Sequence, residues 1–521
     1  MKLVGIDIAI FVAFILAVLA LGLYASRNAS GTKRDYFLAG DKLPWWMIGG
    51  SIVAANISSH HFVGVMGTAY KYGFVAMSIE WGAILVGFNA LLWIFLPFYL
   101  RNGFYTMPEF LERRFGGAAR SAYAALIYLT YVFVEISAVL YLGAVALDTL
   151  FGIDAWYSII GLALLTGIYT ITGGLRAVVW TEMLQLGVLM MGGVTLSIAT
   201  VRACGGLPGV MATSHDWHLL LPYDDPNFPW TQFLGGGLSI SVFYCATNQF
   251  IVQRVLAAKD EWHARMGVVF TDFLKLLLPL IIVIPGIMAP TLFPNLKNSD
   301  QAFPTLVENL LPPGLVGLVM AGLIAAIMSH VSGALNSCTT IATMDFYVPY
   351  FGKNKSEKQA VGFGKTVGAV TLALGILWAG ILTQFSHRPI FIYLMDAYGF
   401  FAPGIAAMFL LGIFWKRATH AGALAAGALT IPMSIVMNRL FPSFPFANRT
   451  GVVFWSCIVL GIVVSLMTKP KSEEELKGMI WNKESMVLPK ESRAQMRGLR
   501  NPVIWWALIT AVVLFFYIRY H

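Results

Sequence analysis

The feature that most constrains this chain is a succession of about fourteen apolar runs, each long enough to cross a lipid bilayer as a helix. Short polar connections separate them, which leaves little chain for a water-soluble domain. Of the 521 residues, 58% are hydrophobic and only 12% are charged, whereas about a quarter are charged in soluble domains. The sequence therefore predicts an all-α integral membrane protein and excludes a soluble enzyme. The runs lie near residues 5–25, 43–70, 75–99, 119–151, 155–173, 177–201, 233–253, 266–293, 313–345, 360–385, 388–414, 418–438, 450–468 and 502–519.

The placement of Lys and Arg predicts the orientation in the membrane. If the N-terminus lies outside, the inward connections carry about 26 of these cations and the outward connections about 8, which is the bias that inward loops show. Because the number of spans is even, we expect both termini outside a bacterial inner membrane. The net charge of +9 therefore reflects topology, not a nucleic-acid-binding surface. The Lys- and Glu-rich segment 469–500 is expected to be an amphipathic surface stretch or a solvated connector.

Two of the runs carry small polar residues where a lipid-facing helix would carry Leu and Ile. One reads G-G-S-I-V-A-A-N-I-S-S-H-H-F from Gly49, and the other reads G-G-G-L-S-I-S-V-F-Y-C-A-T-N-Q-F from Gly235. Two interrupted helices, five spans apart, are typical of an inverted-repeat transporter with its binding site at the bilayer midplane. The alternative is that Gly and Ser only allow close helix packing.

Ionisable side chains inside spans are costly and are therefore candidates for function. Asp272 and Lys275 are three residues apart on one helical face, so a neighbouring carboxylate is the structural alternative for Lys275. The candidates are His60, His61, Glu80, Glu135, Asp272, Lys275, His330 and Asp396.

Enzyme and channel chemistry find little support in the same residues. Only three of the nine histidines lie within spans, which is too few for a multi-cofactor redox core. No H-E-x-x-H or G-x-S-x-G run lies in a span, and the four cysteines suggest neither disulfides nor a metal site. A channel would need a symmetric pore or a filter loop. Transport by alternating access, without an organic cofactor, fits better.

Six segments carry a resemblance to a known family. The chain resembles the sodium:solute symporter family over nearly its whole length, and in particular its sodium/glucose and sodium/galactose cotransporters. The segments are T-K-R-D-Y-F-L-A-G-D-K-L-P-W-W from Thr32, A-A-N-I-S from Ala54, T-G-G-L-R-A-V-V-W-T-E-M-L-Q from Thr172, N-Q-F-I-V-Q-R from Asn248, L-N-S-C-T-T-I-A-T-M-D-F-Y from Leu335 and F-L-L-G-I-F-W-K-R from Phe409.

The resemblance implies a leucine-transporter-type core of two inverted five-helix repeats. The expected organisation is a first peripheral helix and inward loop (1–42), a first repeat (43–201), an outward loop (202–232), a second repeat (233–414) and three C-terminal helices (415–521).

The resemblance also implies a sugar site. Glu80 and Lys275 correspond to the family's sugar-binding Glu and Lys, Tyr244 to the inner-gate tyrosine, and Phe391 to an outer-gate aromatic. Such groups suit a ring of hydroxyls with an apolar C–H face. The residues expected to bind substrate are His61, Glu80, Glu135, Ser241, Tyr244, Lys275, Phe391 and Met395.

Several of these positions depart from the galactose-binding pattern. Ser241 replaces an Asn, Met395 a Gln, Ile79 an outer-gate Tyr and Ala83 a Ser, so the substrate is open among hexoses, deoxy sugars, polyols and sugar derivatives. Glu135 stands where sialic-acid members use Arg, which disfavours an acidic substrate.

The implied sodium site departs as well. Its ligands would be Ala54, Ile57, Ala326, Ser329 and then His330, where the family has a second hydroxyl. Sodium prefers oxygen ligands, so imidazole removes one of them. A protonated His330 could stand in for the cation and couple transport to protons; alternatively, His330 points aside and Ser332 or water completes a weakened sodium site.

These observations together predict a cation-coupled symporter that takes up a sugar or polyol by alternating access. The alternatives are a uniporter or sensor of the same fold without ion coupling, and a symporter for a different neutral solute.

Overall fold

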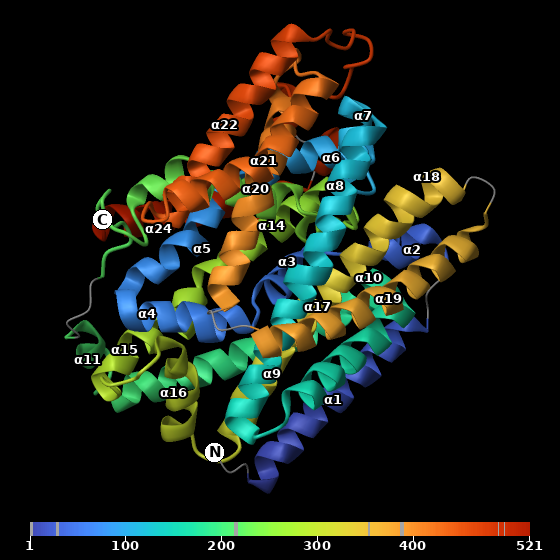
Figure 1. Ribbon diagram of the computed structural model, residues 1–521. Coiled ribbons are helices and arrows are strands. Elements are labelled where there is room, and N and C mark those ends of the chain that lie inside the picture. The colour runs from blue at the N-terminus through green and yellow to red at the C-terminus, as the bar shows by residue number, and fades with distance from the viewer. Residues whose placement is uncertain are drawn as a thin grey trace.

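The computed structural model describes the chain except for residues 1–3, 28–30, 213–216, 353–354, 386–389, 488 and 494, together with the side chains of 149–150, 207, 211, 385, 390–396 and 490–491. Among the described residues every regular element is a helix (Figure 1). Extended pairing is limited there to two isolated bridges, Leu43 with Ala258 and Leu221 with Pro229.

Eleven helical stretches of the described chain are long and apolar enough to cross a membrane. They differ in how much of their surface other helices cover. In an apolar 18-residue window of the stretch Leu315–Phe351, which begins with α17 (Leu315–Ile341), 89% is buried, whereas in the corresponding window of α1 (Gly5–Ser26) only 22% is buried although it is more apolar. Helix α17 therefore forms the centre of the bundle and α1 its lipid-facing edge, as Figure 1 shows.

The eleven stretches agree with the fourteen predicted spans once long and interrupted helices are considered. Helix α10 (Ala155–Ala203) has 49 residues and contains two predicted spans. They meet at Gly174, whose φ of 58° and ψ of −154° bend the helix. A Cβ there would lie 2.3 Å from the carbonyl oxygen of Tyr36, so only glycine fits this close approach.

The other two predicted spans are the interrupted helices, which are too short to count as crossings. Helix α3 (Trp45–Asn56) ends where Ile57 is extended, at φ −76° and ψ 116°, and the chain resumes in a π turn at His61–Val65 and in α4 (Met66–Tyr72). Helix α12 (Gly236–Ser241) continues as a π turn to Thr247 and ends at the extended Asn248. The side chain of Asn248 accepts a hydrogen bond from the backbone of Phe250 and so caps α13 (Gln249–Leu256).

The remaining helices surround this core. Helix α5 (Ser78–Ala83) is followed by π turns at Ile84–Phe88 and Leu91–Phe95. The others are α2 (Lys33–Leu38), α6 (Leu96–Asn102), α7 (Met107–Phe115), α8 (Gly117–Thr130), α9 (Ser137–Phe151), α11 (Leu207–Met211), α14 (Glu261–Leu276), α15 (Ile284–Leu292), α16 (Ala302–Leu310), α18 (Val348–Phe351), α19 (Glu357–Phe385), α20 (Ile390–Phe414), α21 (His420–Leu440), α22 (Phe446–Met467), α23 (Lys490–Arg493) and α24 (Pro502–Arg519).

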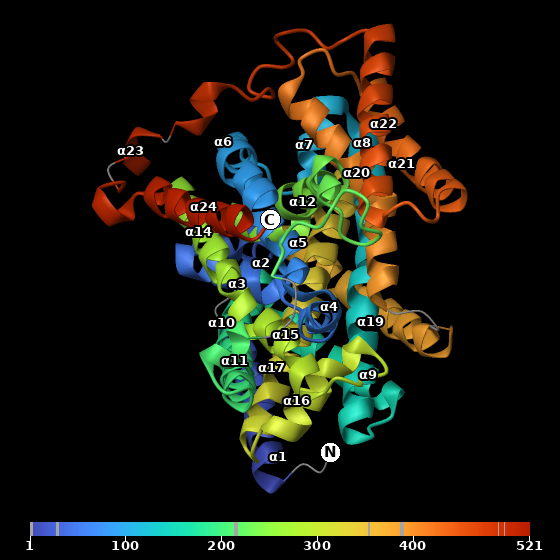
Figure 2. The same ribbon diagram turned by 90° about the vertical axis from the view of Figure 1, so that its left-hand side faces the viewer.

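The segment between α22 and α24 crosses one end of the bundle in a mostly irregular path (Figure 2). It is tied down by cations of the helical core. Arg101 donates to the carbonyl oxygens of Glu484 and Val487, at 3.3 and 2.5 Å, and Arg265 donates to that of Met486 at 3.2 Å. Of the two predictions for 469–500, the structure thus favours the connector over a continuous amphipathic helix.

Candidate substrate and ion site

A cavity of about 150 Å³ lies beside the break in α3 and continues into a wider vestibule of about 520 Å³. Three of its predicted lining residues, His61, Glu135 and Tyr244, lie on π turns. Such turns bulge from a regular helix and are frequent at functional sites. The cavity is lined by Asn56, Ser58, His60, His61, Val65, Thr68, Ala76, Ile79, Glu80, Ala83, Phe88, Glu135, Val139, Phe228, Ile240, Ser241, Tyr244, Cys245, Lys275, His330 and Tyr398.

Lys275 lies at the centre of the first polar group. Its Nζ is 2.5 Å from Glu80 Oε2 and 2.5 Å from Asn56 Oδ1, and the side chain is 1% exposed. The partner is therefore Glu80 of α5 and not Asp272, the neighbour on its own helix. Asp272 is buried, and its Oδ1 has no hydrogen-bond partner among the described residues.

His61 joins this group through Glu80. Its Nδ1 accepts a hydrogen bond from the backbone N–H of Ser58 at 3.3 Å, so the ring hydrogen is assigned to Nε2, which lies 3.3 Å from Glu80 Oε1. His61 therefore faces the cavity as a neutral imidazole. His61, Glu80 and Lys275, which were all predicted to bind substrate, form one connected set.

Tyr244 adds an aromatic wall to the same group. Its hydroxyl accepts a hydrogen bond from Asn56 Nδ2 at 3.1 Å. Its ring meets the ring of Tyr398 edge-on, with centroids 6.2 Å apart. Asn56, which bridges Tyr244 and Lys275, was not among the predicted site residues, although it lies in the A-A-N-I-S segment and ends an interrupted helix.

Glu135, His330 and Tyr398 form a second polar group in the cavity. Glu135 Oε2 lies 2.8 Å from His330 Nε2, and Oε1 accepts from the Tyr398 hydroxyl at 2.5 Å. Glu135 and His330 were predicted to act in different sites, one with the substrate and the other with the cation. The sequence contained no signal for Tyr398 in particular.

The hydrogen bonds of His330 determine the charge of this group. Its Nδ1 lies 2.9 Å from the carbonyl oxygen of Ala55, which can only accept, so Nδ1 carries a hydrogen. If the ring were neutral and Glu135 ionised, the lone pair on Nε2 would face a lone pair of the carboxylate, and the two would repel each other. One proton must therefore lie between Nε2 and Glu135, and the pair has no net charge whichever atom holds that proton.

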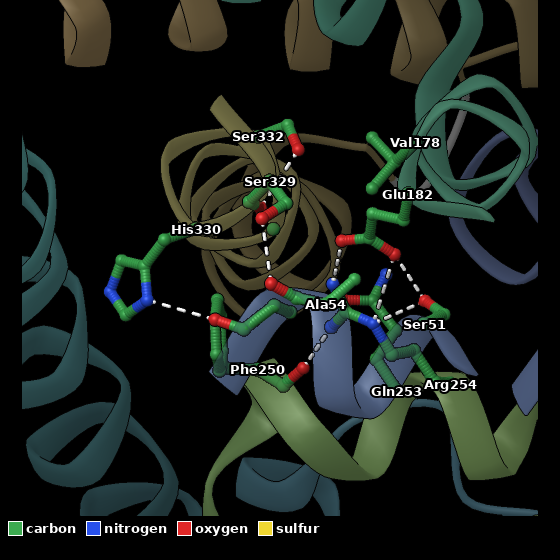
Figure 3. Close-up of polar contacts among 12 residues, drawn as sticks. Ser51, Ala54, Val178, Glu182, Phe250, Gln253, Arg254, Ser329, His330 and Ser332 are labelled. Carbon is green, nitrogen blue, oxygen red and sulfur yellow. Dashed lines mark hydrogen bonds and ion pairs between the residues drawn. The ribbon is translucent and has the colours of Figure 1, made fainter. Parts of the chain in front are cut away.

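Three of the five predicted cation ligands lie together beside this pair. Ser329 Oγ lies 2.6 Å from the carbonyl oxygen of Ala54 and 3.1 Å from that of Ala326. Figure 3 shows the His330 ring turned away from these oxygens; its Nδ1 contacts the next carbonyl of the α3 break, that of Ala55. Ser332 Oγ donates instead to the carbonyl of Ser329 at 2.9 Å. Ile57 follows Ala54 in the extended break, where its carbonyl is free of the helical hydrogen-bonding pattern.

A buried ion pair joins α13, α10 and α3 next to the predicted cation ligands (Figure 3). Arg254 of α13 is 2.5 Å from Glu182 Oε1 of α10 and 2.6 Å from Ser51 Oγ of α3, and Ser51 also contacts Glu182. Arg254 and Glu182 are 1% and 0% exposed. Neither was predicted: Arg254 directly follows the apolar run 233–253, and Glu182 lies inside the run 177–201 but was not singled out.

The remaining predicted residues are placed as follows. Ser241 lines both the cavity and the vestibule, and Ile79 and Ala83 also line the cavity. The side chains of Phe391 and Met395 lie outside the described residues.

Comparison with known proteins gives a consistent result. Residues 36–430 match the sodium:solute symporter family. The sodium/glucose cotransporter of Vibrio parahaemolyticus is 37% identical over 505 residues, 90% of this chain and 92% of that protein. The human sodium/myo-inositol cotransporter is 33% identical, over 94% of this chain and 78% of that protein. The rabbit sodium/glucose cotransporter 1 is 32% identical, over 91% of this chain and 81% of that protein.

Solved structures show the same fold. A substrate-bound, outward-open Na⁺-coupled sialic acid symporter superposes with a TM-score of 0.81 at 23% identity, covering 90% of this chain and 99% of that one. The nucleobase-cation-symport-1 transporter Mhp1, in a closed conformation, gives 0.58 at 17% identity, covering 87% and 99%. These likenesses confirm the predicted leucine-transporter-type fold.

Proposed function

The chain belongs to the sodium:solute symporter family, and from this premise we propose that it couples inward movement of sodium to uptake of a neutral sugar or polyol. The observation that carries the proposal is the linked set Lys275, Glu80, His61 and Asn56 beside the ring of Tyr244. Donors and acceptors fixed around one aromatic face suit a solute with hydroxyls on its edge and C–H groups on its face.

Charge balance favours a neutral solute over an acidic one. Lys275 and Glu80 neutralise each other, and the single shared proton neutralises His330 and Glu135. A carboxylated solute would bring an unbalanced charge into a buried cavity, which is costly.

The coupling sodium would lie against Ala54, Ile57, Ala326 and Ser329. Three of these oxygens already lie close together in the structure, and carbonyl and hydroxyl oxygens are the ligands that hard cations prefer. His330 would then orient Glu135 instead of binding sodium. Ion binding between α3 and α17 would favour the outward-open state, and differential affinity for two states is what drives accumulation.

The proposed orientation places the vestibule outside and the Arg254–Glu182 pair on the inner side, in a multi-pass protein of a bacterial inner membrane. Both termini would lie outside, following the bias of Lys and Arg. The proposed repeats are 43–201 and 233–414, which begin with the two interrupted helices; 1–42 precedes them, 202–232 joins them and 415–521 follows.

The test is uptake by the purified protein in liposomes. Labelled glucose, with galactose, fucose and myo-inositol as competitors, is followed under an imposed sodium gradient and separately under an imposed pH gradient. Accumulation driven by sodium is the expected result. Accumulation driven only by the pH gradient would overturn sodium coupling, and saturable equilibration without accumulation would indicate a uniporter. If none of the four solutes enters or competes, the substrate class is wrong.

A further inference from the structure

The substrate cavity meets the vestibule at a largely apolar neck. Three apolar side chains from three separate segments form it: Ile79 of α5, Ile240 of α12 and Phe228 of the loop before α12. Only Phe228 is both aromatic and carried by a loop. The residues that line both spaces are Thr68, Ile79, Phe228, Ile240 and Ser241.

We propose that Phe228 is the outer lid of the substrate cavity and stacks on the bound solute. The stacking rests on the proposed function, because it requires a solute with an apolar face. Phe228 lines the outer end of the cavity, whereas Tyr244 lines the cavity without reaching the vestibule. A sugar or polyol would thus contact one aromatic ring toward each side of the membrane, with the polar groups at its edge.

The loop that carries Phe228 is folded so that the ring is held over the neck. The Asp225 carboxylate accepts hydrogen bonds from the backbone N–H groups of Asn227 and Phe228, at 2.8 and 2.7 Å. At the base of the loop, the N–H of Trp230 donates to the carbonyl of Leu221 at 3.0 Å. Asp225 therefore fixes the backbone from which the ring projects.

The ring itself rests on the interrupted helix that contributes to the cavity. Phe228 meets Tyr72, the last residue of α4, edge-on, with centroids 5.3 Å apart at 69°. Helix α4 follows the π turn that begins at His61. The lid thus contacts the end of the same segment whose start contacts the solute, so a shift of that segment would move both.

The experiment combines transport with labelling of a cysteine placed in the neck. Thr68→Cys is introduced together with Cys204→Ser and Cys245→Ala, which remove the native cysteine that is not buried and the one that lines the cavity. A membrane-impermeant methanethiosulfonate reagent is then added from outside. In this parent protein, sodium with the solute it transports should slow labelling, because the lid closes over the occupied cavity.

Adding Phe228→Ala should abolish this protection and raise the half-saturating solute concentration about tenfold, the loss of one aromatic contact. Asp225→Ala should also reduce the protection and raise the half-saturating solute concentration, because it frees the loop but keeps the ring. Phe228→Leu, which keeps apolar bulk, should give intermediate values. The matched control is Tyr223→Ala, an aromatic of the same loop that is 71% exposed and does not line the cavity; it should behave as the parent.

Unchanged protection and half-saturation in Phe228→Ala would overturn the lid. If the proposed function is wrong, no solute accumulates in the parent protein. The lid can then still be tested by the rate at which the cysteine in the neck is labelled without solute. In that case faster labelling of Phe228→Ala than of the parent supports the lid, and equal rates overturn it.

Discussion

Lys275 has a buried ammonium whose two partners lie on other segments of the chain, Glu80 and Asn56. Removing one member of a buried pair leaves the other charge uncompensated, at a cost of about 3–5 kcal/mol. We expect Lys275→Met to lower the thermal stability of the detergent-solubilised protein markedly and to abolish uptake. Lys275→Met with Glu80→Gln should recover much of the stability but no uptake. A single variant as stable as the wild type would contradict the pairing.

His330 gives a second prediction at the residue scale. His330→Ser would replace a ring that points at Glu135 with a hydroxyl next to Ser329, adding an oxygen ligand to the proposed sodium site. We expect the half-saturating sodium concentration for uptake to fall several-fold. The control is Ser329→Ala, which removes an oxygen from the site and should raise the half-saturating sodium concentration. If the half-saturating sodium concentration is the same in His330→Ser as in the wild type, the assigned ligands are wrong.

At the scale of helices, the pair Arg254–Glu182 joins α13, α10 and α3 on the side that we assign to the cytoplasm. Arg254→Met would leave Glu182 buried without a counter-ion. We expect greater access of a thiol reagent to the native Cys245 from the inner side, measured in inside-out vesicles. Arg254→Met combined with Glu182→Leu should recover stability but not closure, and inner access equal to the wild type in both variants would exclude this role.

The sequence predicted the helices better than it predicted which side chains contact each other. Gly clusters and small polar residues correctly marked both interrupted helices, because such residues are unusual in a lipid-facing span. The pairing of Lys275 could not be read in the same way: Asp272 is its neighbour in sequence, whereas Glu80 reaches it only after two helices pack together. The joining of Glu135 with His330 has the same origin, since 195 residues separate them.

At the scale of the whole molecule, the cation bias predicts where the chain ends lie. We expect a reporter that is active only outside the cytoplasm, such as alkaline phosphatase, to be active when fused after His521. Fused within the connector between α22 and α24, near Gly478, the same reporter should be inactive. Activity at both places, or at neither, would show that one span has been miscounted.

The fourteen spans are recovered only when the whole bundle is considered. One long helix, α10, which is bent at Gly174, holds two of them, and two others are divided into pieces too short to cross alone. Hydropathy located these runs because it depends on composition. It could not show that α17 occupies the centre, because α1 is more apolar and yet lies at the edge.

The break that ends α3 joins the two proposed binding sites. Within five residues, the carbonyl of Ala54 faces the cation ligands, that of Ala55 fixes His330, the side chain of Asn56 holds Lys275 and Tyr244, and the backbone of Ser58 orients His61. Ion affinity and solute affinity are therefore not separate properties that can be engineered one at a time. By the reciprocity of linkage, a substitution here that alters how tightly the solute is held also alters the ion gradient at which the transporter operates.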